Sequence, residues 1–277
     1  MNAASPPPVP SRFPVAALPF DVRPGEVGRN LEAALAGLEA AASAGARLLL
    51  LPEKWTTSFL PGYRPALLEE NDRALAALHE RAAELGVTVI GSAPGGGGGE
   101  RPWNELHVLG AAGDQRPYRK RILFSPTNEE EQCRAGEELL RVFQTPVGKV
   151  AAVICYDLRF PELTRPAFYG GADLLVVPAQ WPRPRNPVLE LLTRARAAEN
   201  QCWALSCNRA GRASLGSLEM EFPGTATLAD PTGRETARSE AGRLLLGEVD
   251  RDLLRRIRET VPCARDLERS GVGKKLR

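Results

Sequence analysis

Histidine is nearly absent from this sequence, which contains only two, His79 and His107, in 277 residues. His79 lies in a helical pattern and His107 in a strand-like segment, so both are predicted to be surface or core residues. A papain-like cysteine hydrolase needs a histidine partner, and zinc hydrolases usually need several. The scarcity of histidine therefore argues against both classes of enzyme.

Long apolar runs and clusters of one charge are also missing. No apolar stretch approaches the roughly 18 residues of a membrane-spanning helix, and residues 1–10 lack the basic region and apolar core of a signal peptide. The formal net charge is only +2, so neither nucleic acid nor a membrane is expected as a partner. The weak charge favours a small-molecule ligand or no ligand.

The cysteines give no sign of a metal site or of disulfides. There are five, at positions 133, 155, 202, 207 and 263, an odd number without metal-like spacing. No metal site is predicted, and the protein is expected to be reduced and cytoplasmic.

The remaining pattern indicates an α/β protein, because apolar strand-like segments alternate with amphipathic helices. Residues 1–12 are predicted to be a flexible arm, 124–136 a long polar loop, and 263–277 a polar tail. Helices are expected over 27–44, 65–85, 162–169, 186–200 and 250–260. Strands are expected over 12–19, 46–52, 86–92, 103–109, 115–119, 150–155, 172–179, 202–207, 223–229 and 244–249. The layer rules allow either two facing sheets with helices outside or a three-layer doubly wound sheet.

The segment Val150-Ala-Ala-Val-Ile-Cys155 predicts a buried strand, and Pro161 opens a helix shortly after it. Cys155 is therefore expected at the carboxyl end of a central strand, the edge at which α/β sheets bind ligands. A sharp turn there can expose a nucleophile beside a backbone N–H. Free cysteine is also a common core residue, so this segment alone leaves both interpretations open.

Two other predicted strands end in charged residues, Glu53 after Leu-Leu-Leu-Pro and Lys120 after Tyr-Arg. A buried carboxylate can act as a general base for a thiol, and an ammonium group can hold an oxyanion. With Cys155, these residues suffice for covalent acyl transfer without histidine. The structural alternatives are a helix cap or ion pair for Glu53 and a solvated basic face for Lys120.

Together, these motifs resemble those of the nitrilase, or carbon–nitrogen hydrolase, superfamily. The resemblance spans about residues 13–250 and rests on the ordered motifs Leu-Pro-Glu53, Tyr-Arg-Lys120 and Cys155-Tyr-Asp-Leu-Arg-Phe-Pro-Glu, with Asn104, Arg134-Ala-Gly136 and Arg196-Ala-Ala-Glu-Asn-Gln201 as matching flanks. It implies a four-layer αββα sandwich, here over residues 13–262, that forms a homodimer or a higher homo-oligomer through its outer helices.

The resemblance also implies a catalytic triad and the roles of its members. Glu53 matches the general base, Lys120 the oxyanion-stabilising lysine and Cys155 the nucleophile, while the backbone N–H of Tyr156 matches the second oxyanion donor. The implied reaction hydrolyses a C–N bond through a thioester and requires neither a metal nor an organic cofactor.

A second catalytic glutamate is expected in the acidic stretch between the lysine and the cysteine. Counted back from Arg134-Ala-Gly136, it falls on Glu129, but Glu130 and Glu131 leave the register open.

The residues after Cys155 favour the amidase branches, which include ω-amidases and deaminated-glutathione amidases. Tyr156-Asp157 stands where true nitrilases usually carry Trp-Glu. The implied substrate is the amide of a small carboxylic or α-keto acid, which would give the acid and ammonia. An N-carbamoyl amine or amino acid is the alternative substrate. A catalytically silent binding protein on this fold is a further alternative, which the complete triad disfavours.

Two side chains are candidates for substrate binding. Arg159 either meets a substrate carboxylate or pairs with Glu162 to brace the turn. Trp181 and the loop that follows it, residues 182–187, are candidates for a wall of the pocket, and the alternative for Trp181 is an ordinary packed aromatic residue.

Three positions depart from the family pattern. Lys54 replaces an apolar residue, Ile122 stands where histidine is frequent, and Cys133 occupies a position where an aromatic residue is common. These changes are expected to reshape the pocket.

Overall fold

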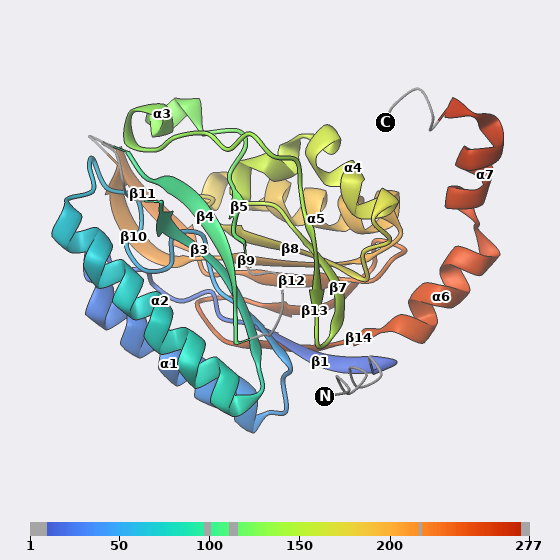
Figure 1. Cartoon of the computed structure of the whole chain (residues 1–277), viewed down its shortest axis with the longest axis horizontal. Helices are drawn as coiled ribbons and strands as arrows, with labels where there is room; N and C mark the ends of the chain where they lie inside the picture. The colour runs from blue at the N-terminus through green and yellow to red at the C-terminus, as the bar shows by residue number, and fades with distance from the viewer. Residues whose placement is uncertain (1–9, 97–100, 111–115, 216–217, 273–277) are drawn as a thin grey trace, which may run out of the picture.

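The computed structural model describes residues 10–96, 101–110, 116–215 and 218–272. Two six-stranded sheets face each other and carry helices on their outer sides (Figure 1). The first sheet has the order β14-β1-β2-β3-β4-β5 and the second β13-β12-β9-β8-β7-β6. The predicted four-layer αββα sandwich is confirmed.

The strands of the first sheet are β1 (Arg12–Ala17), β2 (Leu48–Leu50), β3 (Thr88–Gly95), β4 (Trp103–Leu109), β5 (Tyr118–Arg119) and β14 (Leu245–Asp250). Those of the second are β6 (Val142–Thr145), β7 (Gly148–Ala152), β8 (Leu174–Ala179), β9 (Trp203–Asn208), β12 (Ala226–Ala229) and β13 (Glu235–Ser239). A separate ribbon consists of β10 (Ala210–Leu215) and β11 (Leu218–Pro223). The helices are α1 (Val27–Ser43), α2 (Pro65–Leu85), α3 (Glu129–Gln132), α4 (Pro161–Tyr169), α5 (Asn186–Asn200), α6 (Arg251–Thr260) and α7 (Cys263–Ser270).

The first sheet is apolar on both faces because each face covers a different layer. Successive side chains of a strand point to opposite faces, and parallel pairing aligns Val15 with Leu48 and Ala16 with Leu49. Val15 and Leu48 belong to the core between the two sheets. Ala16 and Leu49 belong to a second core beneath α1 and α2. This double burial explains why Leu48 to Leu51 form a continuous apolar run rather than an alternating one.

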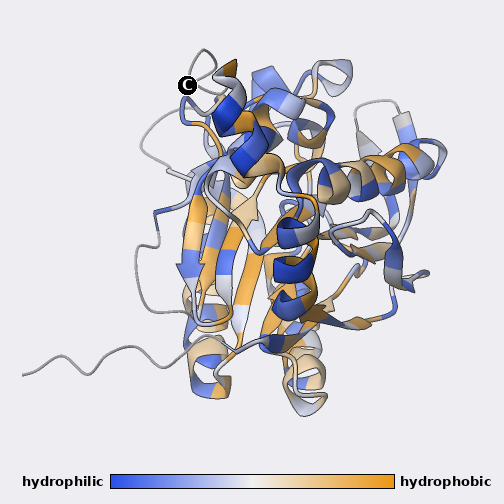
Figure 2. Cartoon of the chain, turned by 90° about the vertical axis from the view of Figure 1, so that its right-hand side faces the viewer, coloured by the Kyte–Doolittle hydropathy of each residue, from blue (hydrophilic) through white to orange (hydrophobic). Residues whose placement is uncertain are grey.

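The outer helices have the boundaries that their sequences indicate. α2 begins with Pro65, whose missing N–H is not needed in the first turn, and ends at Gly86 in the left-handed region with φ of 65°. α4 and α5 lie together on the outer side of the second sheet (Figure 1). The strands are rich in hydrophobic residues, whereas α6 and α7 are mainly hydrophilic (Figure 2).

Several predicted boundaries were wrong or incomplete. The expected polar loop 124–136 contains a single turn of 3-10 helix and then α3, which is too short for its periodicity to be recognised. The expected polar tail begins with α7, all of whose residues are at least partly exposed. The strands β6, β10, β11 and β13 were not predicted because they are short or half-exposed. The domain boundaries stay predictions, and most of the arm 1–12 lies outside the described residues.

His107 introduces a buried titratable ring into β4. The residue is half-buried, and its Nε2 atom has no hydrogen-bond partner among the described residues. Burial lowers the pKa of His107 to about 4. An unfolded histidine has a pKa of about 6.5, so the unfolded chain binds more protons than the folded chain between these two values. Stability is therefore lost as the pH falls through this window.

We expect His107→Gln to reduce the acid sensitivity of the fold. Between pH 7 and pH 5 the free energy of unfolding of the wild type should fall by on the order of 1 kcal/mol more than that of the variant, a value discounted because water reaches part of the ring. Urea denaturation of both proteins at the two pH values measures this difference. Equal losses in the two proteins would contradict the assignment.

Candidate active site

Cys155 lies at a sharp turn after a buried strand. β7 ends at Ala152, and Cys155 begins a 3-10 turn that continues to Arg159 and leads into α4. Cys155 has φ of 50°, in the left-handed region that non-glycine residues rarely adopt. Such conformations persist where the surrounding structure enforces them, and they are concentrated at functional sites. The turn places Cys155 above the sheet edge, with Tyr156 at a position whose N–H is not used within the helical turn.

Asp157 fastens this turn to the strand that carries Lys120. Its buried carboxylate accepts hydrogen bonds from the Tyr118 hydroxyl at 2.9 Å, the Ile122 N–H at 2.8 Å and the Ile154 N–H at 3.3 Å. Burial raises the pKa of Asp157 to about 6, although these donors and the nearby lysine favour the charged form. The sequence motif contained Asp157, but its structural role became visible only in the fold.

Arg196 supports the same turn from α5. Its side chain donates to the carbonyl oxygens of Leu158 and Arg159, each at 3.2 Å. This contact explains why a motif near the end of α5 accompanies the cysteine motif.

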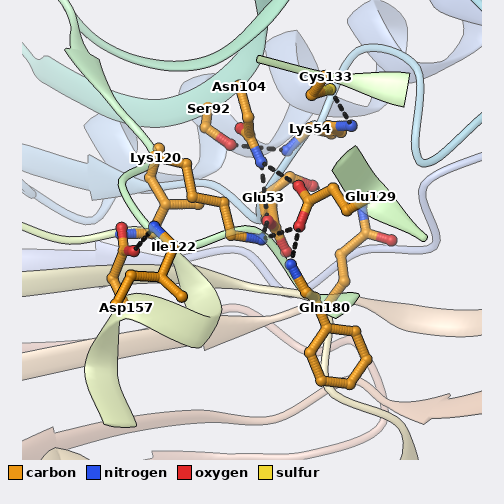
Figure 3. A network of polar contacts seen from close by, with 12 residues as sticks. Glu53, Lys54, Ser92, Asn104, Lys120, Ile122, Glu129, Cys133, Asp157 and Gln180 are labelled. Atoms are coloured by element: carbon orange, nitrogen blue, oxygen red, sulfur yellow. Dashed lines mark hydrogen bonds and ion pairs between the residues drawn. The ribbon is translucent and has the colours of Figure 1, made fainter. Parts of the chain in front are cut away.

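Lys120 joins two carboxylates in the interior (Figure 3). Its Nζ atom donates to Glu53 Oε1 at 2.8 Å and to Glu129 Oε2 at 2.7 Å. Asn104 on β4 also donates to Glu53 Oε1, at 2.8 Å, and more weakly to Glu129 Oε1, at 3.4 Å. All four side chains are buried. The candidates Glu53, Lys120 and Glu129, which lie up to 76 residues apart in the sequence, therefore meet in the structure. The first two follow the strands β2 and β5, and the third lies on the short helix α3.

The acidic register that the sequence left open is clear in the structure. Glu129 is fully buried against Lys120, whereas Glu130 and Glu131 are exposed. The Phe124 N–H also donates to Glu129 Oε2, at 2.8 Å.

These contacts set the protonation states of the cluster. Burial alone lowers the pKa of Lys120, but the carboxylates of Glu129 and Glu53 outweigh it, so this pKa lies well above its usual value. Burial likewise raises the pKa of Glu129, and Lys120 together with Lys54 more than compensates, so that the pKa is lowered. Near neutral pH the lysine is an ammonium ion and Glu129 a carboxylate.

The Cys155 thiol, in contrast to Lys120 and Glu129, favours its neutral form. Burial and the adjacent Glu53 carboxylate raise its pKa well above the usual value, and Lys120 only partly opposes them. The sulfur is therefore a thiol at rest, and a base is needed to make it a nucleophile. Glu53 Oε2 is buried without a hydrogen-bond partner among the described residues, so this oxygen is free to accept the proton.

Gln180 is a site residue that the sequence did not single out. It follows β8, and its Nε2 atom donates to the main-chain oxygen of Glu53 at 2.6 Å. Its backbone N–H also interacts with the Cys155 sulfur and favours the thiolate. Gln180 thus ties the segment of the carboxylate to the second sheet.

A pocket opens from Cys155 to the surface. Its lining residues are Phe124, Cys155, Tyr156, Arg159, Gln180, Trp181, Pro182 and Arg185. Tyr156 packs edge-to-face against Phe124, with ring centroids 5.0 Å apart. Trp181 is buried, and the loop after it was predicted to form the wall of the pocket.

Two guanidinium groups stand over the aromatic walls of this pocket. Arg159 lies 4.8 Å from the centroid of the Trp181 ring, and Arg185 lies 5.0 Å from that of the Phe124 ring. Both arginines are exposed, and in the described part of the chain neither forms an ion pair with an acidic side chain. The alternative in which Arg159 pairs with Glu162 is therefore not observed. Arg185 was not a candidate, although it lies on the loop that drew attention in the sequence.

The three departures from the family pattern do not line this pocket. Ile122 contributes its backbone N–H to Asp157, whereas the Lys54 ammonium contacts the Cys133 sulfur behind Glu129 (Figure 3). None of the three therefore shapes the pocket by direct contact, and the expectation that they reshape it stays a prediction.

The two histidines have no part in the cluster. His79 on α2 accepts a hydrogen bond from the Gly110 N–H at 3.2 Å, and His107 lies on β4 as described above. Within the described ranges, no group of three or more His, Cys, Asp or Glu side chains is arranged to hold a metal ion. No helix in those ranges is both long enough and apolar enough to cross a membrane.

Comparison with known sequences gives the same assignment over nearly the whole chain. The carbon–nitrogen hydrolase family model matches residues 15–259. The 2-oxoglutaramate amidase of Bacillus subtilis (strain 168) is 31% identical over 263 residues, which cover 93% of this chain and 98% of that protein. The chloroplastic omega-amidase of Arabidopsis thaliana is 32% identical over 86% of this chain and 68% of its own length.

Comparison with solved structures supports the same assignment. An amidase from Nesterenkonia sp. superposes with a TM-score of 0.76 at 27% identity, covering 88% of this chain and 92% of that chain. A variant of that amidase carries the acetamide moiety of fluoroacetamide covalently at its active-site cysteine. The carbon–nitrogen hydrolase from Helicobacter pylori G27 has a TM-score of 0.83 at 21% identity over 92% of this chain and 95% of that chain, and it supports the fold alone. The chain belongs to the carbon–nitrogen hydrolase family.

Proposed function

We propose that this protein hydrolyses the amide of a small carboxylic or α-keto acid to the acid and ammonia, with Cys155 as the nucleophile. The observation that carries the proposal is the unpartnered Oε2 of Glu53 beside a buried thiol whose pKa is raised. The relatives named 2-oxoglutaramate amidase and omega-amidase support this substrate class. A cytoplasmic location and assembly into a homodimer or a higher homo-oligomer remain part of the proposal.

In the first half of the reaction, Glu53 removes the thiol proton as Cys155 attacks the amide carbon. The tetrahedral oxyanion then lies between the Lys120 ammonium and the Tyr156 N–H. A well-placed donor of this kind contributes about 3–4 kcal/mol to transition-state stabilisation. The protonated Glu53 then gives its proton to the leaving ammonia, and a thioester on Cys155 remains.

In the second half, Glu53 takes a proton from a water molecule, which attacks the thioester carbon. The C–S bond then breaks, the acid is released, and Glu53 returns the proton to the Cys155 sulfur. Glu129 remains a carboxylate and holds the Lys120 ammonium in place through the 2.7 Å contact. Every step uses side chains of this chain and the bound substrate, so the proposed mechanism requires neither a metal nor an organic cofactor.

The acid group of the substrate binds at the rim of the pocket. Arg159 and Arg185 stand over the two aromatic walls without acidic partners in the described ranges. A guanidinium group binds a carboxylate through two parallel hydrogen bonds. A substrate with a carboxylate several bonds away from its amide would place the amide at Cys155 and the acid at the arginines, with Trp181 as the wall between them.

The reaction is tested by the products released from an ω-amide. The wild type should release ammonia without carbon dioxide from an ω-amide such as a dicarboxylic acid monoamide, and Cys155→Ala should abolish this release, since no nucleophile remains. Ammonia and carbon dioxide are measured over a panel of ω-amides, simple amides, nitriles and N-carbamoyl amino acids. Carbon dioxide from a carbamoyl compound would favour an N-carbamoyl hydrolase instead. No turnover on any member of the panel would favour a binding protein.

The two arginines at the rim are expected to affect substrate binding rather than the chemical step. Arg159→Met and Arg185→Met should each raise KM for an acidic amide by about 10-fold, which corresponds to the loss of one charge-assisted contact of about 1.4 kcal/mol. KM for a neutral amide of similar size should stay unchanged. Arg183→Met is the matched control, because Arg183 is on the same loop but pairs with Glu221 and does not line the pocket. Equal effects on acidic and neutral amides would contradict carboxylate recognition.

A further inference from the structure

Two of the departures from the family pattern, Lys54 and Cys133, form a pair in the interior. Lys54 Nζ lies 3.1 Å from Cys133 Sγ (Figure 3). Lys54 is fully buried, and Cys133 is 1% exposed. An unpaired buried ammonium is strongly disfavoured. Lys54 therefore needs polar partners in the interior, and Cys133 is one of them. The pocket does not include either of them.

Lys54 is held firmly at both ends. Its backbone, with φ of 43°, donates its N–H to Ser92 Oγ at 2.9 Å. Its Nζ atom also donates to the Tyr63 hydroxyl at 2.9 Å and lies 4.3 Å from the centroid of the Phe59 ring. The hydroxyl, the sulfur and the aromatic face together accommodate the positive charge.

The pair connects the segments that carry the two catalytic carboxylates. Lys54 directly follows Glu53, so its main chain moves with the general base. Cys133 ends α3, and its N–H donates to the main-chain oxygen of Glu129 at 2.9 Å. The contact between Lys54 and Cys133 therefore joins the loop after β2 to the short helix that presents Glu129. A four-residue helix makes few hydrogen bonds of its own, so this outside contact contributes to its position.

The charges of the interior also require a second cation. Glu53 and Glu129 share one ammonium, that of Lys120, so this single positive charge faces two buried carboxylates. Lys54 supplies the balancing charge, since its interaction with Glu129 favours the charged form of each. The polar and titratable groups around Glu129 are Glu53 and Lys54 after β2, Tyr63 in the following loop, Asn104 on β4, Lys120 after β5 and Cys133 at the end of α3.

We propose that Lys54, held by Cys133, is a positioning residue that keeps Glu129 ionised and seated against Lys120. It does not touch the substrate, and it acts through the second glutamate. The proposal rests on the proposed function in one respect, namely that Glu129 serves the reaction. It accounts for both departures as one compensated change, in which a polar pair replaces two residues that are apolar in the common pattern.

The test compares Lys54→Met with Lys54→Arg, which keeps the charge. In Lys54→Met the acid limb of the kcat profile should move to higher pH by about one unit, because Glu129 loses one of its two counter-charges. At a pH on that limb kcat should fall about 10-fold, while KM changes by less than about twofold, since Lys54 does not line the pocket. Lys54→Arg should keep the wild-type acid limb. An unmoved limb in Lys54→Met, or an equal shift in Lys54→Arg, would overturn the proposal.

A second measurement follows Glu129 without any turnover. The free energy of unfolding is measured against pH for the wild type and Glu129→Gln, and again for both in the Lys54→Met background. The difference within each pair isolates the contribution of Glu129. Because the pKa of this carboxyl group is lowered in the folded wild type, the contribution is present above the unfolded value and is lost as the pH falls. In the Lys54→Met background this contribution should be smaller and should be lost at higher pH.

These two measurements separate the inference from the proposed function. A shift in the stability difference without amide turnover would support the role of Lys54 while the proposed reaction fails. Amide turnover with neither quantity shifted would overturn the role of Lys54 alone.

If Lys54→Met does not fold, Cys133→Ala and Cys133→Ser give the same test at the other end of the contact. Serine keeps an acceptor for Lys54, whereas alanine removes it. The acid limb should move to higher pH in Cys133→Ala and stay in place in Cys133→Ser. An unmoved limb in Cys133→Ala would overturn the proposal.

Discussion

The ammonium group of Lys120, shared by two carboxylates in a dry interior, is the interaction on which the site depends. Neither Glu53 nor Glu129 is exposed, and both direct an oxygen at the same nitrogen. In such surroundings a charge that loses its partner is much more costly than the same loss at the surface. The segments that carry these three residues must therefore keep their relative positions. The sandwich meets this requirement because it anchors two of them at strand ends and the third on a helix fastened to both.

The proposed chemistry uses the hydrogen-bonding groups of Lys120 and Glu53 that this cluster leaves without partners. Lys120 uses two of its three N–H donors on carboxylates, so that one remains for an oxyanion. Glu53 uses Oε1 for Lys120 and Asn104 and leaves Oε2 unpaired beside the thiol. A buried acceptor without a partner is destabilising, and a resting thiol with a raised pKa is unreactive. In the proposed reaction, these two features make Glu53 the base and Cys155 the nucleophile, with the proton transferred when a substrate fills the pocket.

Charge is distributed differently in the interior and at the rim of the pocket. The interior holds compensated charges that form ion pairs with one another, with Lys54 as a second buried cation. At the rim, Arg159 and Arg185 stand over aromatic rings and remain available to an anion. In the proposed function, the first set tunes protonation in a low dielectric. The second set binds the acid group of the substrate in contact with water, where each contact is weaker and therefore reversible.

The amino-acid sequence by itself determined the alternation of strands and helices, because apolar periodicity and the turn residues record it locally. Three motifs in order also indicated one family, which the family model and the sandwich fold confirm, and they made Glu53, Lys120 and Cys155 the candidate catalytic residues. Short strands such as β6, the helix α3 and the α7 segment were missed, because few residues carry too weak a periodic signal. Only the tertiary structure decided which of the three consecutive glutamates meets Lys120, that Gln180 and Arg185 belong to the site, and that Lys54 and Cys133 are partners. Each of these depends on contacts between distant segments, and sequence periodicity does not encode which buried side chain faces which.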